Sequence, residues 1–215
     1  MNKRIFISPS SQDDNIYATG NTNEQEQCRK IADSCEKYLL KHGFIVKNSK
    51  LNSMYKRVTE SNNFNADIHI AIHTNATKDH KTTGGTQILL YNLSGERLKI
   101  ASHIFDCLSP FTVGNTAEKI YAEPDFYEIK SANAITIYCE CEFHDTKKGS
   151  DFIIKNSEKI GELIGKGVCN YYGIKEKSTI YKVQTGAFSE RTNAEKMQKE
   201  LKNAGFESFI VEVSE

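Results

Sequence analysis

Residues that could bind a metal ion or transfer protons stand at the ends of elements expected to meet at one edge of a sheet. His73 closes the apolar stretch 66–76, Ala-Asp-Ile-His-Ile-Ala-Ile-His-Thr-Asn-Ala, whose alternation predicts a buried strand. Glu140 ends a second strand, and Glu24 or Glu26 begins a helix. Because strand carboxyl ends and the following helix starts share one edge of a parallel sheet, we expect these side chains to converge.

An imidazole and a carboxylate from separate elements can hold a divalent ion, and zinc suits this pair best. A second carboxylate that is not a ligand could then move protons for a metal-bound water. Each residue also has a plainer interpretation. Glu24 can simply complement the helix dipole, Glu140 can face solvent, and a histidine at a strand end is commonly structural.

The elements that position these residues alternate between strand and helix through residue 174. Strands are predicted at residues 4–8, 44–46, 66–76, 86–91, 126–129 and 134–140, and helices at 24–42, 54–62, 96–108 and 150–172. Residues 77–83 and 110–124 are expected to be loops. The alternation predicts a three-layer α/β domain over residues 1–174 with a mostly parallel, mixed central sheet.

The pattern changes after a charged linker, residues 175–179. A strand at 180–185, a helix at 192–204 and a strand at 208–213 predict a small β-α-β unit over residues 180–215. A unit of this size is at or below the length that folds unaided. We therefore expect it to pack on the main domain, to pair with a second copy as a homodimer, or to be a truncated remnant.

Composition limits the classes of function. Lys and Arg together number 28, as do Asp and Glu, so the formal net charge is zero and no global field attracts nucleic acid. No apolar run is long enough for a transmembrane helix, so membrane insertion is not expected. The six cysteines lack C-x-x-C spacing, and we expect them to be reduced and mostly buried.

The first residues have the basic start of a signal peptide, but the apolar stretch that follows covers only residues 5–7. That stretch is far too short for the apolar region of a signal peptide. The sequence therefore predicts a protein made in the cytoplasm, which acts outside the cell only after release.

Four stretches together resemble the zinc-dependent N-acetylmuramoyl-L-alanine amidases, the family of the CwlC-like cell-wall lysins. They are Glu24 opening a helix that reaches Ile31-Ala32, the run Arg57-Val-Thr-Glu-Ser-Asn62, the strand 66–76, and Ala134-Ile-Thr-Ile-Tyr-Cys-Glu140-Cys-Glu-Phe143. The resemblance covers roughly residues 5–172. The family pattern Glu-x-x-Phe selects Glu140 over Glu142, and the spacing to Ala32 selects Glu24 over Glu26.

The resemblance implies a peptidoglycan hydrolase that cleaves the amide between N-acetylmuramic acid and the L-alanine of the stem peptide. It implies Zn2+ as the cofactor, with Glu24 and His73 as ligands and Glu140 as base and acid for a zinc-activated water. Bacterial peptidoglycan, both glycan strand and stem peptide, is the expected partner. Action on the cell wall would follow release by phage lysis or by lysis of a mother cell.

The first strand departs from the family pattern. The family has Asp-Pro-Gly-His-Gly-Gly there, whose histidine is the third ligand, and this chain has Ser11 in its place. His144, four residues past Glu140, is the expected substitute ligand. Residues 12–14 lie on the same loop as Ser11, although the glutamine among them is a poor zinc ligand. His69 precedes His73 by four residues, which is about 13 Å along a strand, and is expected to be structural.

The tail resembles half of a SPOR domain, a peptidoglycan-binding module. The likeness rests on Tyr181-Lys-Val-Gln-Thr-Gly-Ala-Phe-Ser, Asn193-Ala-Glu-Lys and Leu201-Lys-Asn-Ala-Gly-Phe. A complete module has two β-α-β halves, and residues 180–215 resemble one of them. Wall binding by these residues is what the resemblance implies. The alternative function is that of a catalytically inactive wall-binding protein that kept the amidase fold.

Overall fold

The computed structural model describes residues 2–77, 84–114, 119–174 and 183–213. Contacts divide the chain into two compact units, Met1–Lys175 and Glu176–Glu215, which are described separately. The predicted linker 175–179 lies outside the described residues, as do residues 78–83 of the predicted loop 77–83.

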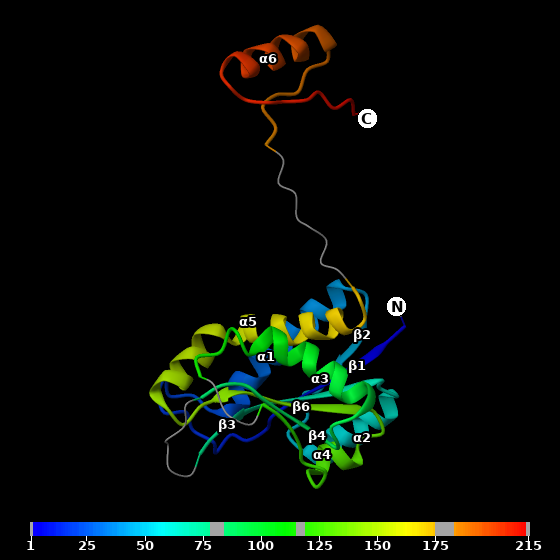
Figure 1. Ribbon diagram of the computed structural model, residues 1–215, viewed down its shortest axis with the longest axis vertical. Coiled ribbons are helices and arrows are strands. Elements are labelled where there is room, and N and C mark those ends of the chain that lie inside the picture. Colours follow the sequence, from blue (N-terminus) through cyan, green and yellow to red (C-terminus); the bar gives the residue numbers. More distant parts are fainter. Residues whose placement is uncertain (1, 78–83, 115–118, 175–182, 214–215) are drawn as a thin grey trace. The chain divides into compact units, whose positions relative to one another are not determined.

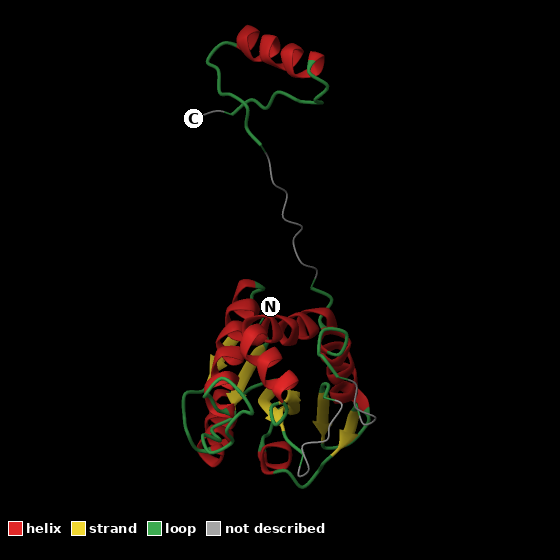
Figure 2. Cartoon of the chain, turned by 90° about the vertical axis from the view of Figure 1, so that its left-hand side faces the viewer, coloured by secondary structure: helices red, strands yellow, loops and turns green. Residues whose placement is uncertain are grey.

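The first unit is built on one six-stranded sheet with the order β2-β1-β3-β6-β4-β5 (Figures 1 and 2). Its strands are β1 (Arg4–Pro9), β2 (Ile45–Asn48), β3 (Ile68–Asn75), β4 (Gln87–Leu90), β5 (Ile120–Ala122) and β6 (Ile135–Phe143). All neighbours are parallel except β4 and β6, which are antiparallel. The predicted α/β class with a mostly parallel, mixed sheet is confirmed.

Helices cover both faces of this sheet (Figure 1). One face carries α1 (Glu24–Lys41), α3 (Gly95–Leu108) and α5 (Lys147–Tyr171), and the other carries α2 (Met54–Phe64) and α4 (Tyr127–Ser131). None of the helices that the structure describes is long and apolar enough to cross a membrane.

The alternation of β3 explains how the sheet is held between its helices. Ile68, Ile70 and Ile72 are buried in the large apolar cluster formed with α1, α3 and α5. Ala71, on the opposite face, belongs to a smaller cluster with Tyr138 of β6. Strand residues of alternate parity therefore pack against opposite helical layers, and the parity of β3 sends His69 and His73 toward the α4 side.

Two predicted segments differ from the structure. Residues 126–129 were expected to be a strand, but they lead into and form the start of α4. Glu128 and Ile129 are consecutive and both buried, which a helical turn permits and the alternation of a half-buried strand does not. The predicted loop 110–124 contains the short strand β5, which pairs with β4.

The second unit contains the helix α6 (Arg191–Asn203). The strand expected at 208–213 is absent. Of the strand expected at 180–185, residues 183–185 form no strand and residues 180–182 lie outside the described residues. A strand forms only where a neighbour supplies ladder hydrogen bonds, and a lone pair of short strands is marginal in water. The chain instead returns along the helix, where Gln198 Nε2 donates to the Ser208 carbonyl at 2.8 Å.

The cysteines, all within the described residues, form no disulfide, and five of the six are buried. They therefore contribute to the interior as small apolar side chains, as the sequence predicts.

Candidate functional site

A carboxylate and an imidazole meet at the carboxyl edge of the sheet. Asn23 caps α1 by accepting from the Glu26 N–H at 2.9 Å, which places Glu24 in the first helical turn. Glu24 Oε1 accepts from His73 Nδ1 at 2.9 Å, and both side chains are buried. Glu26, the alternative that the sequence offered, is exposed, and its carboxylate accepts from Thr22 Oγ1.

The strand register places Glu140 beside His73. The two residues are partners in the parallel pairing of β3 with β6, so their side chains leave the sheet on the same face. Glu140 Oε2 is shielded from solvent and has no hydrogen-bond partner among the residues that the structure describes. Tyr138, two residues earlier, stacks on the His73 ring with centroids 4.4 Å apart and planes at 17°.

A third carboxyl group, Glu128 from α4, reaches the same histidine. Glu128 is 1% exposed, and its Oε2 lies 3.6 Å from His73 Nε2. Within the described residues neither of these two atoms has a hydrogen-bond partner. His73 therefore lies between Glu24 at one ring nitrogen and Glu128 at the other.

The other oxygen of Glu128 belongs to a buried polar network. The Ser8 hydroxyl donates to Glu128 Oε1, His69 Nε2 lies 3.3 Å from it, and Arg57 Nε lies 3.9 Å away. Arg57 Nε also donates to Ser8 Oγ at 2.7 Å, and His69 Nδ1 lies 2.9 Å from Ser61 Oγ. Side chains from three elements, β1, α2 and β3, thus converge on Glu128 of α4, and His69 contacts the site through this carboxylate.

Burial and charge shift the pKa values of these groups in different directions. Burial alone would lower the pKa of His73, but the carboxylates of Glu128 and Glu24 raise it to about 9. Burial opposes the effect of His73 on Glu24 and of His69 and His73 on Glu128, yet the pKa of each carboxyl is held below its ordinary value. For Glu140, burial and the nearby Glu24 raise the pKa to about 7 against the opposing effect of His73.

The loop between β1 and α1 covers the Glu24–His73 pair with amide groups. Gln12 Nε2 lies 3.4 Å from both Glu24 Oε1 and His73 Nδ1. Asn15 Nδ2 donates to Glu24 Oε2 at 2.6 Å and to Gln12 Oε1 at 3.1 Å. Ser11, where the amidase pattern has its histidine, uses its carbonyl to accept from Gln25 Nε2 at 3.2 Å.

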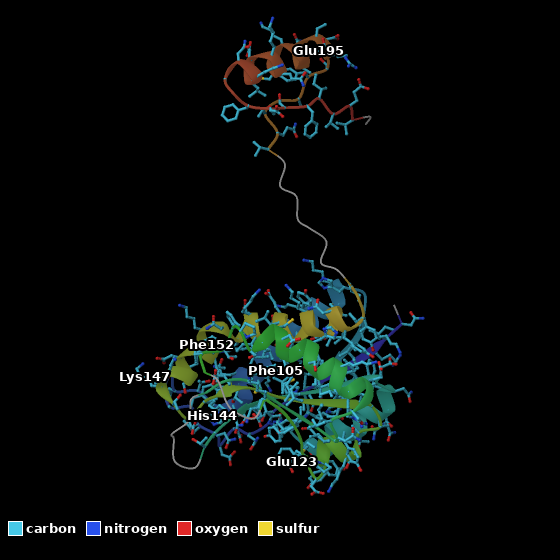
Figure 3. The ribbon with its side chains drawn as sticks, viewed as in Figure 1. Phe105, Glu123, His144, Lys147, Phe152 and Glu195 are labelled. Carbon is cyan, nitrogen blue, oxygen red and sulfur yellow. The ribbon has the colours of Figure 1, made fainter. Side chains whose placement is uncertain are left out.

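His144, expected to be a substitute ligand, contacts Thr74 and Tyr17. Its Nδ1 lies 2.9 Å from Thr74 Oγ1, and its ring stacks on Tyr17 with centroids 4.9 Å apart and planes at 2°. Figure 3 shows it near Lys147 at the start of α5. Within the described ranges no group of three His, Cys, Asp or Glu residues is placed to hold a metal ion, so His144 as a third ligand beside Glu24 and His73 stays a prediction.

Glu142 is buried near the same edge but has a full set of partners. Its Oε1 accepts from the backbone N–H groups of Gly85 at 2.5 Å and Phe143 at 2.8 Å, and its Oε2 accepts from that of Val113 at 3.1 Å. This carboxylate therefore ties two loops to the end of β6. Glu140 Oε2, in contrast, has no hydrogen-bond partner among the described residues.

The sequence does not reveal the positions of two residues of this site, Glu128 and Gln12. Glu128 was missed because residues 126–129 were predicted as a strand, and a lone acidic residue between two apolar neighbours does not show which way it points. Gln12 lies on the same loop as Ser11, but an amide is a weak zinc donor, so the sequence does not single it out. Its position above Glu24 and His73 depends on a loop conformation that spacing does not reveal.

Two donor atoms, one from Glu24 and one from His73, lie at nearly the spacing of two ligands of one zinc ion. Ligands bound at about 2.0 Å to one tetrahedral zinc ion stand about 3.3 Å apart. Glu24 Oε1 and His73 Nδ1, a carboxylate oxygen and an imidazole nitrogen, are 2.9 Å apart. A buried carboxyl oxygen without a partner, as in Glu140, is uncommon and is explained when it faces a bound water or ion.

Comparison with known proteins identifies related sequences. The family model described as N-acetylmuramoyl-L-alanine amidase matches residues 5–170, and the SPOR domain model matches residues 160–214. A Clostridium perfringens protein described as an uncharacterized 38.4 kDa protein is 31% identical over 162 residues, which cover 71% of this chain. The chain spans 46% of the length of that relative.

Solved structures share the fold. The N-acetylmuramoyl-L-alanine amidase AmiC2 of Nostoc punctiforme has a TM-score of 0.69 at 15% identity, covering 80% of this chain and 97% of that chain. An N-acetylmuramoyl-L-alanine amidase from Clostridium difficile 630 has a TM-score of 0.68 at 24% identity, covering 81% and 99%. The catalytic domain of the CD27L endolysin, which targets Clostridia difficile, has a TM-score of 0.62 at 22% identity, covering 79% and 97%.

Proposed function

Because the chain belongs to the N-acetylmuramoyl-L-alanine amidase family, we propose that it binds peptidoglycan and hydrolyses the amide between N-acetylmuramic acid and the L-alanine of the stem peptide. The observation that carries this proposal is Glu140, a carboxyl group whose shielded Oε2 has no partner among the described residues and which lies beside His73. The likeness of residues 160–214 to a SPOR domain supports wall binding by the second unit.

Glu140 is the proposed proton carrier. Burial and Glu24 raise its pKa to about 7, so both protonation states are populated near neutral pH. A general base works best with a pKa close to the working pH. As a carboxylate, Glu140 would take a proton from the attacking water, and as an acid it would return that proton to the leaving amine of L-alanine.

The remaining residues hold the centre in place. Asn15 orients Glu24 through its 2.6 Å hydrogen bond, and Tyr138 fixes the plane of the His73 ring by stacking. Glu128 stands behind the second ring nitrogen of His73. A zinc ion held by Glu24 and His73 would supply a Lewis acid that polarises the scissile carbonyl.

Wall binding without cleavage is the second candidate function. It is favoured by Ser11, a serine where the amidase pattern has a histidine ligand, together with the lack of a three-residue His, Cys, Asp or Glu metal group within the described ranges. Such a protein would keep the fold and the wall-binding unit and would release no stem peptide.

The test uses purified bacterial cell walls and the full chain. The wild-type protein should lower wall turbidity and expose new L-alanine amino termini. Glu140→Gln should reduce the release of termini by at least ~100-fold, within the range expected for loss of a general acid–base group. Glu26→Gln, an exposed carboxyl two residues from Glu24, is the matched control and should keep wild-type activity.

Three outcomes would change the assignment. No new termini from the wild-type protein, with binding to the walls intact, would leave the second candidate function in place of the first. Equal activity in Glu140→Gln would refute the role of that carboxyl. Cleavage at other amide bonds of the stem peptide would refute the proposed bond. Far-UV circular dichroism of each variant checks that the fold is kept.

A further inference from the structure

Three atoms from three parts of the chain form a small triangle at the sheet edge. Glu24 Oε1 and His73 Nδ1 are 2.9 Å apart, and the amide nitrogen of Gln12 lies 3.4 Å from each. Ligands bound at about 2.0 Å to one tetrahedral zinc ion stand about 3.3 Å apart. The triangle therefore has the size of one face of a metal-ligand tetrahedron.

The amide of Gln12 is poorly matched to its two neighbours when its nitrogen faces them. His73 Nδ1 donates to Glu24 Oε1 and so cannot also accept a hydrogen bond from Gln12. The nitrogen can then donate to Glu24 alone, over a long 3.4 Å separation. A half-turn about the last side-chain bond exchanges nitrogen and oxygen and would aim an oxygen lone pair at the centre of the triangle.

The half-turn breaks two hydrogen bonds, from Gln12 Nε2 to Glu24 Oε1 at 3.4 Å and from Asn15 Nδ2 to Gln12 Oε1 at 3.1 Å. It also turns the amide oxygen toward a carboxylate oxygen, so it is favourable only when a cation lies between them. Gln12 is exposed, so its amide N–H groups reach water after the rotation. Asn15 keeps its shorter 2.6 Å hydrogen bond to Glu24 Oε2. That bond leaves Glu24 Oε1 as the oxygen directed at the triangle.

We propose that the amide oxygen of Gln12 is the third protein ligand of a zinc ion held by Glu24 Oε1 and His73 Nδ1, which releases to solvent the proton it donates to Glu24 as the ion binds. Gln12 thereby substitutes for the histidine that Ser11 replaces, and His144 is not required. The surroundings suit a cation, because Glu140, whose Oε2 has no partner among the described residues, is paired in register with His73. In addition, Glu128 stands behind the ring of His73, as a carboxylate often stands behind a ligating histidine.

Binding of the ion does not depend on amidase activity, whereas its use in catalysis rests on the proposed function. The test measures zinc affinity of the full chain, first stripped with a chelator, by competition with a chromophoric chelator. Cobalt substitution gives a second readout, because four-coordinate cobalt absorbs visible light more strongly than cobalt with added water ligands. Neither measurement uses the enzymatic reaction.

Three variants test whether Gln12 is a zinc ligand. Gln12→Ala should weaken zinc binding by at least ~10-fold, the smallest loss expected when even an outer partner of a metal ligand is removed. It should also weaken the cobalt absorption. Gln12→Glu places an anionic oxygen at the same reach and should tighten zinc binding. Asp13→Asn, on the neighbouring exposed residue, is the matched control and should leave both readouts unchanged.

Other results would overturn the assignment. Wild-type zinc affinity in Gln12→Ala would show that Gln12 is not a ligand, and tighter binding in that variant would show that the amide blocks the position. Absence of zinc binding by the wild-type protein would also refute it. If zinc binds as expected but no L-alanine termini appear on cell walls, the ligand assignment stands and the proposed function fails.

Discussion

Replacing Glu128 by glutamine tests whether this carboxylate balances the buried positive charges around it. Glu128 is 1% exposed, as is Arg57, whose Nε lies 3.9 Å from Glu128 Oε1. His73 Nε2 faces the other oxygen at 3.6 Å. The substitution keeps the size of the side chain and removes its charge, so Arg57 is left buried without its carboxylate.

The expected cost follows from that unbalanced charge. Removing one member of a buried ion pair destabilises a protein by about 3–5 kcal/mol. The glutamine amide can still accept from the Ser8 hydroxyl, which places the expected loss near the lower end, about 3 kcal/mol. With a urea slope of about 2 kcal/mol per molar for a domain of this size, the unfolding midpoint should fall by about 1.5 M.

The assay is urea unfolding followed by far-UV circular dichroism, with a chelator present so that no bound metal contributes. Glu26→Gln is the control, because Glu26 is exposed at the start of the same unit, and its loss should cost less than about 1 kcal/mol. If the two variants lose the same small amount, Glu128 does not compensate Arg57. A double variant with Arg57→Gln should cost less than the sum of the single changes, because the two residues share one interaction.

Two further outcomes follow from other buried groups. The pKa of His73 is raised to about 9, so its pairing with the carboxylates stabilises the fold below about pH 7, and this stabilisation is lost as the pH rises from about 7 through 9. With a chelator present, the free energy of unfolding should fall by on the order of 3 kcal/mol across that range. A flat profile would contradict the pairing. Glu142→Gln should cost about 1–3 kcal/mol, because an amide cannot accept all three backbone N–H groups that the carboxylate accepts, and hydrogen exchange at the Gly85 amide should speed up. Unchanged exchange there would show that Glu142 does not hold this loop.

The main domain was predictable from sequence because its strands and helices carry strong periodic signals. The buried isoleucines of β3 and the apolar stripe of α1 each identify their element and its inward face. The segments that differed have weak local signals. Residues 126–129 could form either a short strand or a helical turn, and the choice depends on tertiary burial of Glu128 and Ile129.

The candidate site was predictable where chain direction decides the position of a residue. Glu24 at a helix start, His73 at a strand end and Glu140 on the neighbouring strand meet because parallel topology brings these ends together. Loop residues have no such constraint. Gln12 covers the site and His144 turns toward Thr74, and no spacing in the sequence distinguishes these two placements.

The contrast between Glu140 and Glu142 shows what strand parity alone cannot decide. Two residues apart on a regular strand, they would share one face and have equal access to the sheet edge. The register of β3 with β6 shifts after the His73–Glu140 pair, so β6 carries an extra residue just before Phe143. Such a bulge redirects the side chains that follow it. Glu142 thereby accepts from backbone N–H groups of two loops, whereas Glu140, the register partner of His73, has an Oε2 without a partner among the described residues.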